Sequence, residues 1–284
     1  MHEFIIDLQS HGFLQYALAA GVLASFSAGV VGTFVVVRRI SYVAGGIAHT
    51  VLAGLGAALY LGKAGYWPGL DPLYGAVVAA LIAAVVIGMV SIHAKEREDT
   101  VIGALWAVGM AVGILFISRT PGYNTDLMSY LFGNILMVSR QDLWVILSLD
   151  VLVLCFTVLF YNQFVAVCFD SEFAQLRGLR VQVFYILLLC LTALTVVALT
   201  TAVGIVLVIA LLTLPAAISG AYCRSMRSMM IVSALLCIFF TVSGLVLSYK
   251  HDYPAGAVTI LVAGTVYLGV MVLRSLRIRF FVRG

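Results

Sequence analysis

Long apolar runs, separated by short charged or turn-rich breaks, fill most of this sequence. Each run is close to the ~20 residues that an α-helix needs to cross the hydrocarbon core of a membrane. A soluble domain carries about 25% charged residues, whereas this chain has 10% charged and 63% hydrophobic residues. We therefore predict a single all-α transmembrane domain over 1–284, with nine spans (or eight as the alternative count) near 13–37, 42–61, 73–92, 101–118, 142–161, 182–200, 203–222, 229–249 and 255–273.

Three further patterns bear on how these spans pack. The run 127–138 is too short to cross, which favours a re-entrant or interfacial segment. Small residues recur every fourth position at Gly21, Ser25, Gly29 and Thr33, and again at Gly109 and Gly113. Such stripes let helix backbones approach closely, within the bundle or at a dimer face. The five cysteines are widely spaced and form no CxxC, so we expect neither disulfides nor a structural zinc site.

The basic residues predict the orientation of the chain. With the N-terminus outside and nine alternating spans, the C-terminus lies in the cytoplasm, and the chain is a multi-pass protein of the inner membrane. The outer face then keeps Lys63, Arg119, Arg140 and Lys250. The cytoplasmic face receives twelve of the sixteen basic residues: Arg38, Arg39, Lys95, Arg97, Arg177, Arg180, Arg224, Arg227, Arg274, Arg277, Arg279 and Arg283. The net charge of +4 thus reflects topology, and we expect no nucleic-acid partner.

Two ionisable residues lie deep in predicted spans, His49 and Asp150. Ionisable groups inside a membrane are costly and mark substrate or ion pathways by default. A neutral imidazole is the commonest ligand of transition metals, and a carboxylate beside it would supply the charge for a cation. The alternative for each residue is a structural hydrogen bond between helices. Both residues are therefore candidate metal ligands along a path through the membrane.

The segment 169–180 between two spans has the pattern of a short amphipathic helix. Asp170 or Ser171 can cap it, Phe173 and Leu176 give it one apolar side, and Gly178 can end it. Such a helix either lies on the membrane surface or docks into a groove on a partner. Farther along, Pro215 falls inside a span and must kink it. That kink serves packing, or it marks a moving, cavity-lining helix of a transporter.

Motifs of catalysis are absent from the sequence. It contains no GxxxxGK[ST] phosphate-binding loop, no HExxH and no GxSxG. The chain is therefore not expected to hydrolyse ATP or to catalyse a covalent reaction, and no permanently bound cofactor is expected.

Six stretches, in order along the chain, resemble the permease subunits of the zinc, manganese and iron ABC importer family. They read VVGTFVVVRRISYVAGGIAH, EDTVIGALWAVGMAVG, LFGNILMVSRQDL, FDSEFAQLRGL, VGIVLVIALLTLPAA and DYPAGAVTILVAG. The resemblance implies a fold related to the importers of cobalamin and siderophores. It implies a homodimer that works with two cytoplasmic ATPase subunits and an extracytoplasmic metal-binding protein, and that transports a divalent metal ion by alternating access. The alternatives are a permease for a metal chelate and an ion-coupled carrier that needs no ATPase.

The resemblance also assigns roles to residues. Asp170, Glu172, Ala174 and Gly178 look like the coupling helix that grips the ATPase, and His49 matches the family's intramembrane histidine. Many members carry Asp one helical turn before that histidine, where this chain has Gly45, so a carboxylate would have to come from elsewhere. On the outer side, acidic residues outnumber basic ones, and we expect the delivery protein to dock by charge there, at Asp71 and Asp252.

Overall fold

The computed structural model describes residues 7–8, 10–93, 98–121, 138–251 and 253–282. Within these residues, nine helices are long and apolar enough to cross a membrane, which confirms the predicted helix bundle. The candidate spans begin and end within three residues of the predicted runs. The helices are α2 (Gly12–Val37), α3 (Ser41–Lys63), α4 (Pro72–His93), α5 (Glu98–Arg119), α7 (Arg140–Leu159), α8 (Tyr161–Phe169), α9 (Ser171–Leu176), α10 (Val181–Val203), α11 (Ile205–Tyr222), α12 (Met226–His251) and α13 (Ala255–Val282).

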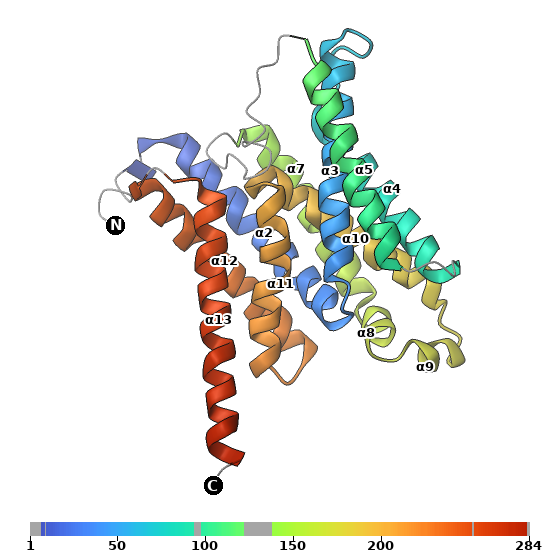
Figure 1. The fold of residues 1–284 in the computed structure, drawn as a ribbon, viewed down its shortest axis with the longest axis vertical. Helices are drawn as coiled ribbons and strands as arrows, with labels where there is room; N and C mark the ends of the chain where they lie inside the picture. Colours follow the sequence, from blue (N-terminus) through green and yellow to red (C-terminus); the bar gives the residue numbers. More distant parts are fainter. Residues whose placement is uncertain (1–6, 9, 94–97, 122–137, 252, 283–284) are drawn as a thin grey trace.

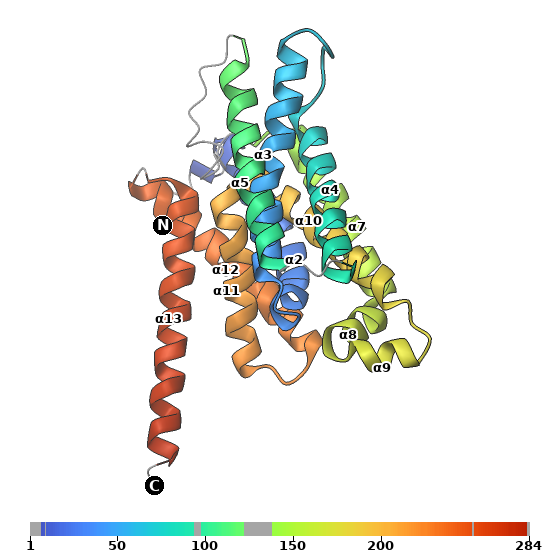
Figure 2. The same ribbon diagram turned by 45° about the vertical axis from the view of Figure 1, so that its right-hand side comes forward.

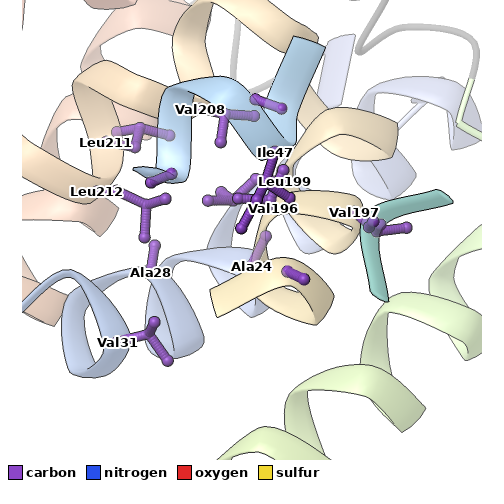
Figure 3. Close-up of a cluster of buried hydrophobic side chains, with 14 of the residues drawn as sticks. Ala24, Ala28, Val31, Ile47, Val196, Val197, Leu199, Val208, Leu211 and Leu212 are labelled. Carbon is purple, nitrogen blue, oxygen red and sulfur yellow. The ribbon is translucent and has the colours of Figure 1, made fainter. Parts of the chain in front are cut away.

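The helices form a central group and a periphery (Figure 1). α2, α3 and α10 are the most buried spans, and α13 is the least buried. Where α2, α3, α10 and α11 meet, a cluster of small and branched apolar side chains fills the space between them (Figure 3). α3, α4 and α5 form a tight subgroup to one side, and α13 stands at the opposite side of the molecule (Figures 1 and 2). Every functional residue considered below belongs to, or adjoins, one of these groups.

Glycines set the closest helix contacts, as the small-residue stripes predicted. A Cβ on Gly109 would lie 2.7 Å from the Cα of Thr50, and one on Gly113 would lie 2.6 Å from the carbonyl oxygen of Leu52. A Cβ on Gly29 would overlap the backbone of Ala234 in α12. In a membrane, helices associate through such close packing because lipid is as apolar as the helix surface. The packing interpretation within the bundle is thus confirmed for these three glycines.

The short helices α8 and α9 mark one end of the molecule, here called the α9 end. The turn at 223–225 and the C-terminal part of α13 lie at this same end in both views (Figures 1 and 2). The connection between α3 and α4 lies at the other end (Figures 1 and 2). Exposed aromatic rings gather around that connection, at Tyr66, Trp67 and Tyr74, as is typical of a membrane–water interface. The segment 127–138, predicted to be re-entrant or interfacial, lies outside the described residues except for Val138.

Candidate functional site

His49 lies on the buried face of α3, where only 8% of its surface is exposed. Its imidazole ring stacks on the indole of Trp106 from α5, with ring centroids 4.1 Å apart and planes 16° from parallel. The Nδ1 atom is buried, and no hydrogen-bond partner for it exists among the described residues. A buried polar atom without a partner costs free energy. Among the described residues, nothing satisfies this nitrogen, so the position has room in its bonding for a ligand.

Gly45 lies one helical turn before His49, and neighbouring side chains occupy the space beside it. A Cβ on Gly45 would lie 2.9 Å from Cζ3 of Trp106 and 3.3 Å from Cδ1 of Ile209 in α11. On the next residue, a Cβ on Gly46 would lie 2.6 Å from Cγ2 of Ile102. The two glycines thus admit side chains from α5 and α11 against the backbone of α3. A carboxylate at position 45 would have to displace the indole ring.

Asp150 lies in α7 on a stripe of buried residues that includes Ile146, Val153 and Thr157. Its side chain is 3% exposed, and both carboxylate oxygens lack a hydrogen-bond partner among the described residues. The hydroxyl of Ser27 in α2 is close enough to act on this carboxylate, but it donates to the carbonyl of Ala24 at 3.2 Å. The Thr157 hydroxyl, two turns along the same stripe, is also unpartnered within the described part of the chain.

The structure gives His49 and Asp150 separate surroundings. α7 packs against α2, α10 and α8, whereas α3 packs mainly against α5 and α4. No group of three or more His, Cys, Asp or Glu side chains that could hold a metal occurs in the described ranges. The carboxylate expected from elsewhere is therefore not found beside His49 in this part of the chain.

Pro215 is buried within α11, and the helix continues through it. Proline has no N–H, so the carbonyl of Leu211, four residues earlier, loses its usual helical donor. The thiol of Cys237 in α12 donates to that carbonyl at 3.4 Å. A neighbouring side chain thus satisfies the group that the proline leaves free, as a membrane interior requires.

The predicted helix between two spans exists as α9, and its predicted caps are confirmed. The Asp170 carboxylate accepts a hydrogen bond of 2.8 Å from the N–H of Phe173. Gly178 ends the helix at φ +82°, with its N–H donating to Gln175 and the N–H of Leu179 donating to Ala174. This is a Schellman motif, in which glycine takes the left-handed residue at little cost.

Apolar side chains are exposed on and beside α9. Phe173 and Leu176 of α9 are exposed, as is Phe169 at the end of α8, and Leu176 is 87% exposed. Ala174 is buried, at 4% exposure, against the rest of the α9 end. An open groove of about 530 Å³ lies beside α9, lined by residues that include Asn162, Ala166, Ala174 and Gly178. Ala174 and Gly178 therefore form part of the wall of this groove. Glu172 lies in the first turn of α9.

Asp71, one of the two acidic residues predicted to receive a delivery protein, stands at the start of α4. Asp71 precedes α4 as its N-cap, and its carboxylate accepts a hydrogen bond of 2.9 Å from the N–H of Leu73. Pro72 follows at the first helical position, where a missing N–H costs nothing. Asp71 thus has a structural task in addition to its charge. Asp252 lies outside the described residues.

Sequence reasoning missed Trp106, Ser27 and Cys237 as neighbours of the predicted residues. Their contacts depend on which helices lie side by side, and a sequence does not contain that information. One signal did point to a large partner side chain: the adjacent glycines Gly45 and Gly46 leave a gap on α3 that a neighbouring helix must fill.

The sequence and the fold of this chain are similar to those of known proteins. The ABC 3 transport family matches residues 10–274. A manganese transport system membrane protein, MntC of Halalkalibacterium halodurans, is 36% identical over 264 residues, which cover 93% of this chain and 88% of the relative. A protein of Chlamydia pneumoniae named "Probable metal transport system membrane protein" is 41% identical over 248 residues, 87% of this chain and 84% of the relative.

A solved structure extends the likeness to three dimensions. A chain of PsaBC from Streptococcus pneumoniae, determined in complex with Fab, superposes with a TM-score of 0.85 at 32% sequence identity. The match covers 95% of this chain and 94% of that chain. With nine apolar helices among its described residues and a family match over almost its whole length, the chain belongs to the ABC 3 transport family, as a multi-pass membrane permease of metal ABC importers.

Proposed function

We propose that this chain, paired with a second copy of itself, forms the membrane path through which an ATP-driven importer moves a divalent transition metal ion by alternating access. Manganese is the first choice among zinc, manganese and iron, because a relative that covers 93% of the chain is named for manganese transport. One observation carries the proposal within the molecule. A buried imidazole nitrogen without a partner lies in a span of a chain from a metal-transporting family.

In this proposal His49 is a transient ligand of the metal ion. Its unpartnered nitrogen can donate a lone pair to a cation, and the site is otherwise apolar and aromatic. A single protein ligand with water in the remaining positions would hold the ion weakly, which suits an ion that must leave again. Asp150 lies apart from His49 and would act as a second ligand of the ion farther along the path. The Thr157 hydroxyl lies on the same buried stripe of α7.

The energy for transport would come from ATPase subunits that dock at the α9 end. Exposed apolar side chains on a capped, preformed helix are suited to a groove on a protein partner. This end also carries Arg224 in the turn and Arg227 in the first turn of α12, together with Arg177 and Arg180 near α9. Their charge supports a cytoplasmic location. The opposite end, with Asp71, would then meet the extracytoplasmic delivery protein.

The test is metal uptake by the intact complex in vesicles, with ATPase activity measured in parallel. We expect His49→Ala to lower uptake by about tenfold or more, the usual effect of disturbing a metal site. Asp150→Asn should lower uptake as well, with ATP hydrolysis retained in both variants. Parental uptake in both variants would remove the two residues from the path. Uptake by the permease alone, without ATPase subunits, would instead favour an ion-coupled carrier.

A further inference from the structure

Trp106 covers α3 over two successive turns. Its ring stacks on His49 at 4.1 Å and reaches over Gly45, where a Cβ would meet Cζ3 at 2.9 Å. Tyr42 of α3 is a second ring neighbour of Trp106, with ring centroids 6.0 Å apart. The indole thus fills the space that a side chain at position 45 would need, and it fixes one face of the imidazole.

The backbones around this ring are held in place. The hydroxyl of Thr50 donates to the carbonyl of Gly46 in its own helix at 2.8 Å and lies 3.3 Å from the carbonyl of Leu105 in α5. Gly109 and Gly113 pack against the backbone of α3. A Cβ on Gly109 would lie 2.7 Å from the Cα of Thr50, and one on Gly113 would lie 2.6 Å from the carbonyl oxygen of Leu52. Sliding of α5 on α3 would break this close packing, whereas rotation of the Trp106 side chain would leave it intact.

We propose that Trp106 is the positioning residue of the cargo site: its ring takes the place of a side chain at position 45 and holds the imidazole of His49 ready for the ion. The inference rests on the proposed function and deepens it. The ion meets one imidazole beside an aromatic wall, with no carboxylate one turn away on α3. An aromatic face attracts a cation and excludes water, but it supplies no lone pair. The ring therefore also shapes which ions the site accepts.

The first test uses the emission of Trp106 itself. The chain has three tryptophans, and the other two, Trp67 and Trp144, are 66% and 64% exposed. Replacing both with Phe in the full-length permease leaves Trp106 as its only tryptophan. Mn²⁺ or Co²⁺ bound at His49 would lie within quenching distance of the stacked ring. We expect saturable quenching that Zn²⁺ reverses by competition and that His49→Ala abolishes.

The second test displaces the ring without deleting it. Gly45→Ala places a methyl group 2.9 Å from Cζ3 of Trp106, the far end of a side chain that can rotate away. The fold should survive, but the ring should leave His49. Because an aromatic stack is worth about 0.5–1.5 kcal/mol, the half-saturating metal concentration should rise by about twofold to tenfold. The maximal uptake rate should change less.

A double variant separates positioning from general damage. In Trp106→Ala the two indole contacts of a Cβ at position 45 are gone and Cδ1 of Ile209 remains at 3.3 Å, so adding Gly45→Ala should do little further harm. Trp106→Phe keeps a ring and should lie between the parent and Trp106→Ala. Gly103→Ala is the matched control, since its Cβ would meet only the Tyr42 hydroxyl at an ordinary 3.4 Å. Trp144→Ala controls for the loss of an exposed tryptophan.

Failure of this inference can be told from failure of the proposed function. Suppose that the parent imports metal and His49→Ala does not. If Trp106→Ala then leaves both the half-saturating metal concentration for uptake and the maximal uptake rate unchanged, Trp106 is not the positioning residue. Additive losses in the double variant would overturn the inference in the same way. If the parental complex imports no metal, the proposed function itself is wrong.

Discussion

At the scale of single residues, the polar groups inside the bundle are of two kinds: those with a hydrogen-bond partner and those without one. Most Ser and Thr hydroxyls donate back to their own helix, as Thr192 does to the carbonyl of Leu188 at 2.9 Å. Ser219 and Ser233 pair at 2.7 Å and join α11 to α12. Against this background, the unpartnered atoms of His49 and Asp150 are exceptions within the described residues. Since such groups are costly in lipid, the exceptions point to function.

Residue types alone identified His49 and Asp150, because an ionisable side chain in an apolar run is visible in any sequence. Their neighbours could not be identified in the same way. That Trp106 fills the place beside Gly45, or that Ser27 faces Asp150, depends on the lateral order of helices. The sequence left adjacency of His49 and Asp150 open, and packing places them against different helices.

The contact between Cys237 and the carbonyl that Pro215 leaves free gives a stability prediction. Cys237→Ala should lower stability by about 0.5–1 kcal/mol, because hydrogen bonds between membrane helices average about 0.6 kcal/mol. In Pro215→Ala the helix supplies its own donor to Leu211, so the same cysteine change should cost less. Thermal unfolding of the detergent-solubilised permease measures both. Cys155→Ala, at an exposed position, is the control. Equal losses with and without Pro215 would show that the thiol does not compensate for the N–H that proline lacks.

Asp71 allows charge and structure to be separated at one residue. Asp71→Asn keeps an oxygen for the N–H of Leu73 but removes the charge, whereas Asp71→Ala removes both. We expect the cap loss in Asp71→Ala to cost about 1 kcal/mol of stability. Asp71→Asn should stay stable yet weaken salt-dependent binding of the delivery protein. Unchanged binding of Asp71→Asn at low and high salt would argue against docking through this charge.

At the scale of elements, the limits of the spans followed from the sequence because apolar runs end where charge or turns begin. The caps of α9 were predictable for the same local reason, since Asp170 and Gly178 act within a few residues of themselves. The separate helix α8 was not predicted. It arises from a break at Phe160, whose φ of −109° and ψ of 22° lie outside the helical range. The sequence has no proline or glycine at this point, so nothing in it predicts the break.

The exposed leucine of α9 gives the coupling prediction its sharpest form. Leu176→Asp should lower affinity for the ATPase by about 2 kcal/mol, or roughly thirtyfold, if this side chain is a central contact. Leu176→Met keeps an apolar side chain of similar volume and should behave as the parent. The measurement is co-purification of ATPase with tagged permease, together with stimulated ATP hydrolysis.

Gly178→Trp should also reduce association, because only a residue tolerant of φ +82° ends the helix without strain. Full association of Leu176→Asp would move the docking site elsewhere.

The whole molecule has two chemically different ends. Within the described residues, the α9 end carries Arg177, Arg180, Arg224 and Arg227, and exposed aromatic rings surround the connection that leads to Asp71. Both features are what a cytoplasmic face and an opposite membrane interface would show. Which end faces the cytoplasm is a prediction from charge.

Labelling of single cysteines tests that orientation. In a background that lacks the five native cysteines, a cysteine at Asp71 or His251 should react with an impermeant reagent added to intact cells, whereas one at Arg227 should react only after the membrane is opened. Placing arginine on the outer face would oppose the bias that sets orientation during insertion, and this is the physical reason for the expectation. Total labelling after solubilisation controls for reactivity, and metal uptake shows that each variant is assembled. Reaction of the Arg227 position from outside in intact, transporting cells would reverse the assignment, with the α9 helix and its ATPase surface then on the wrong side for ATP.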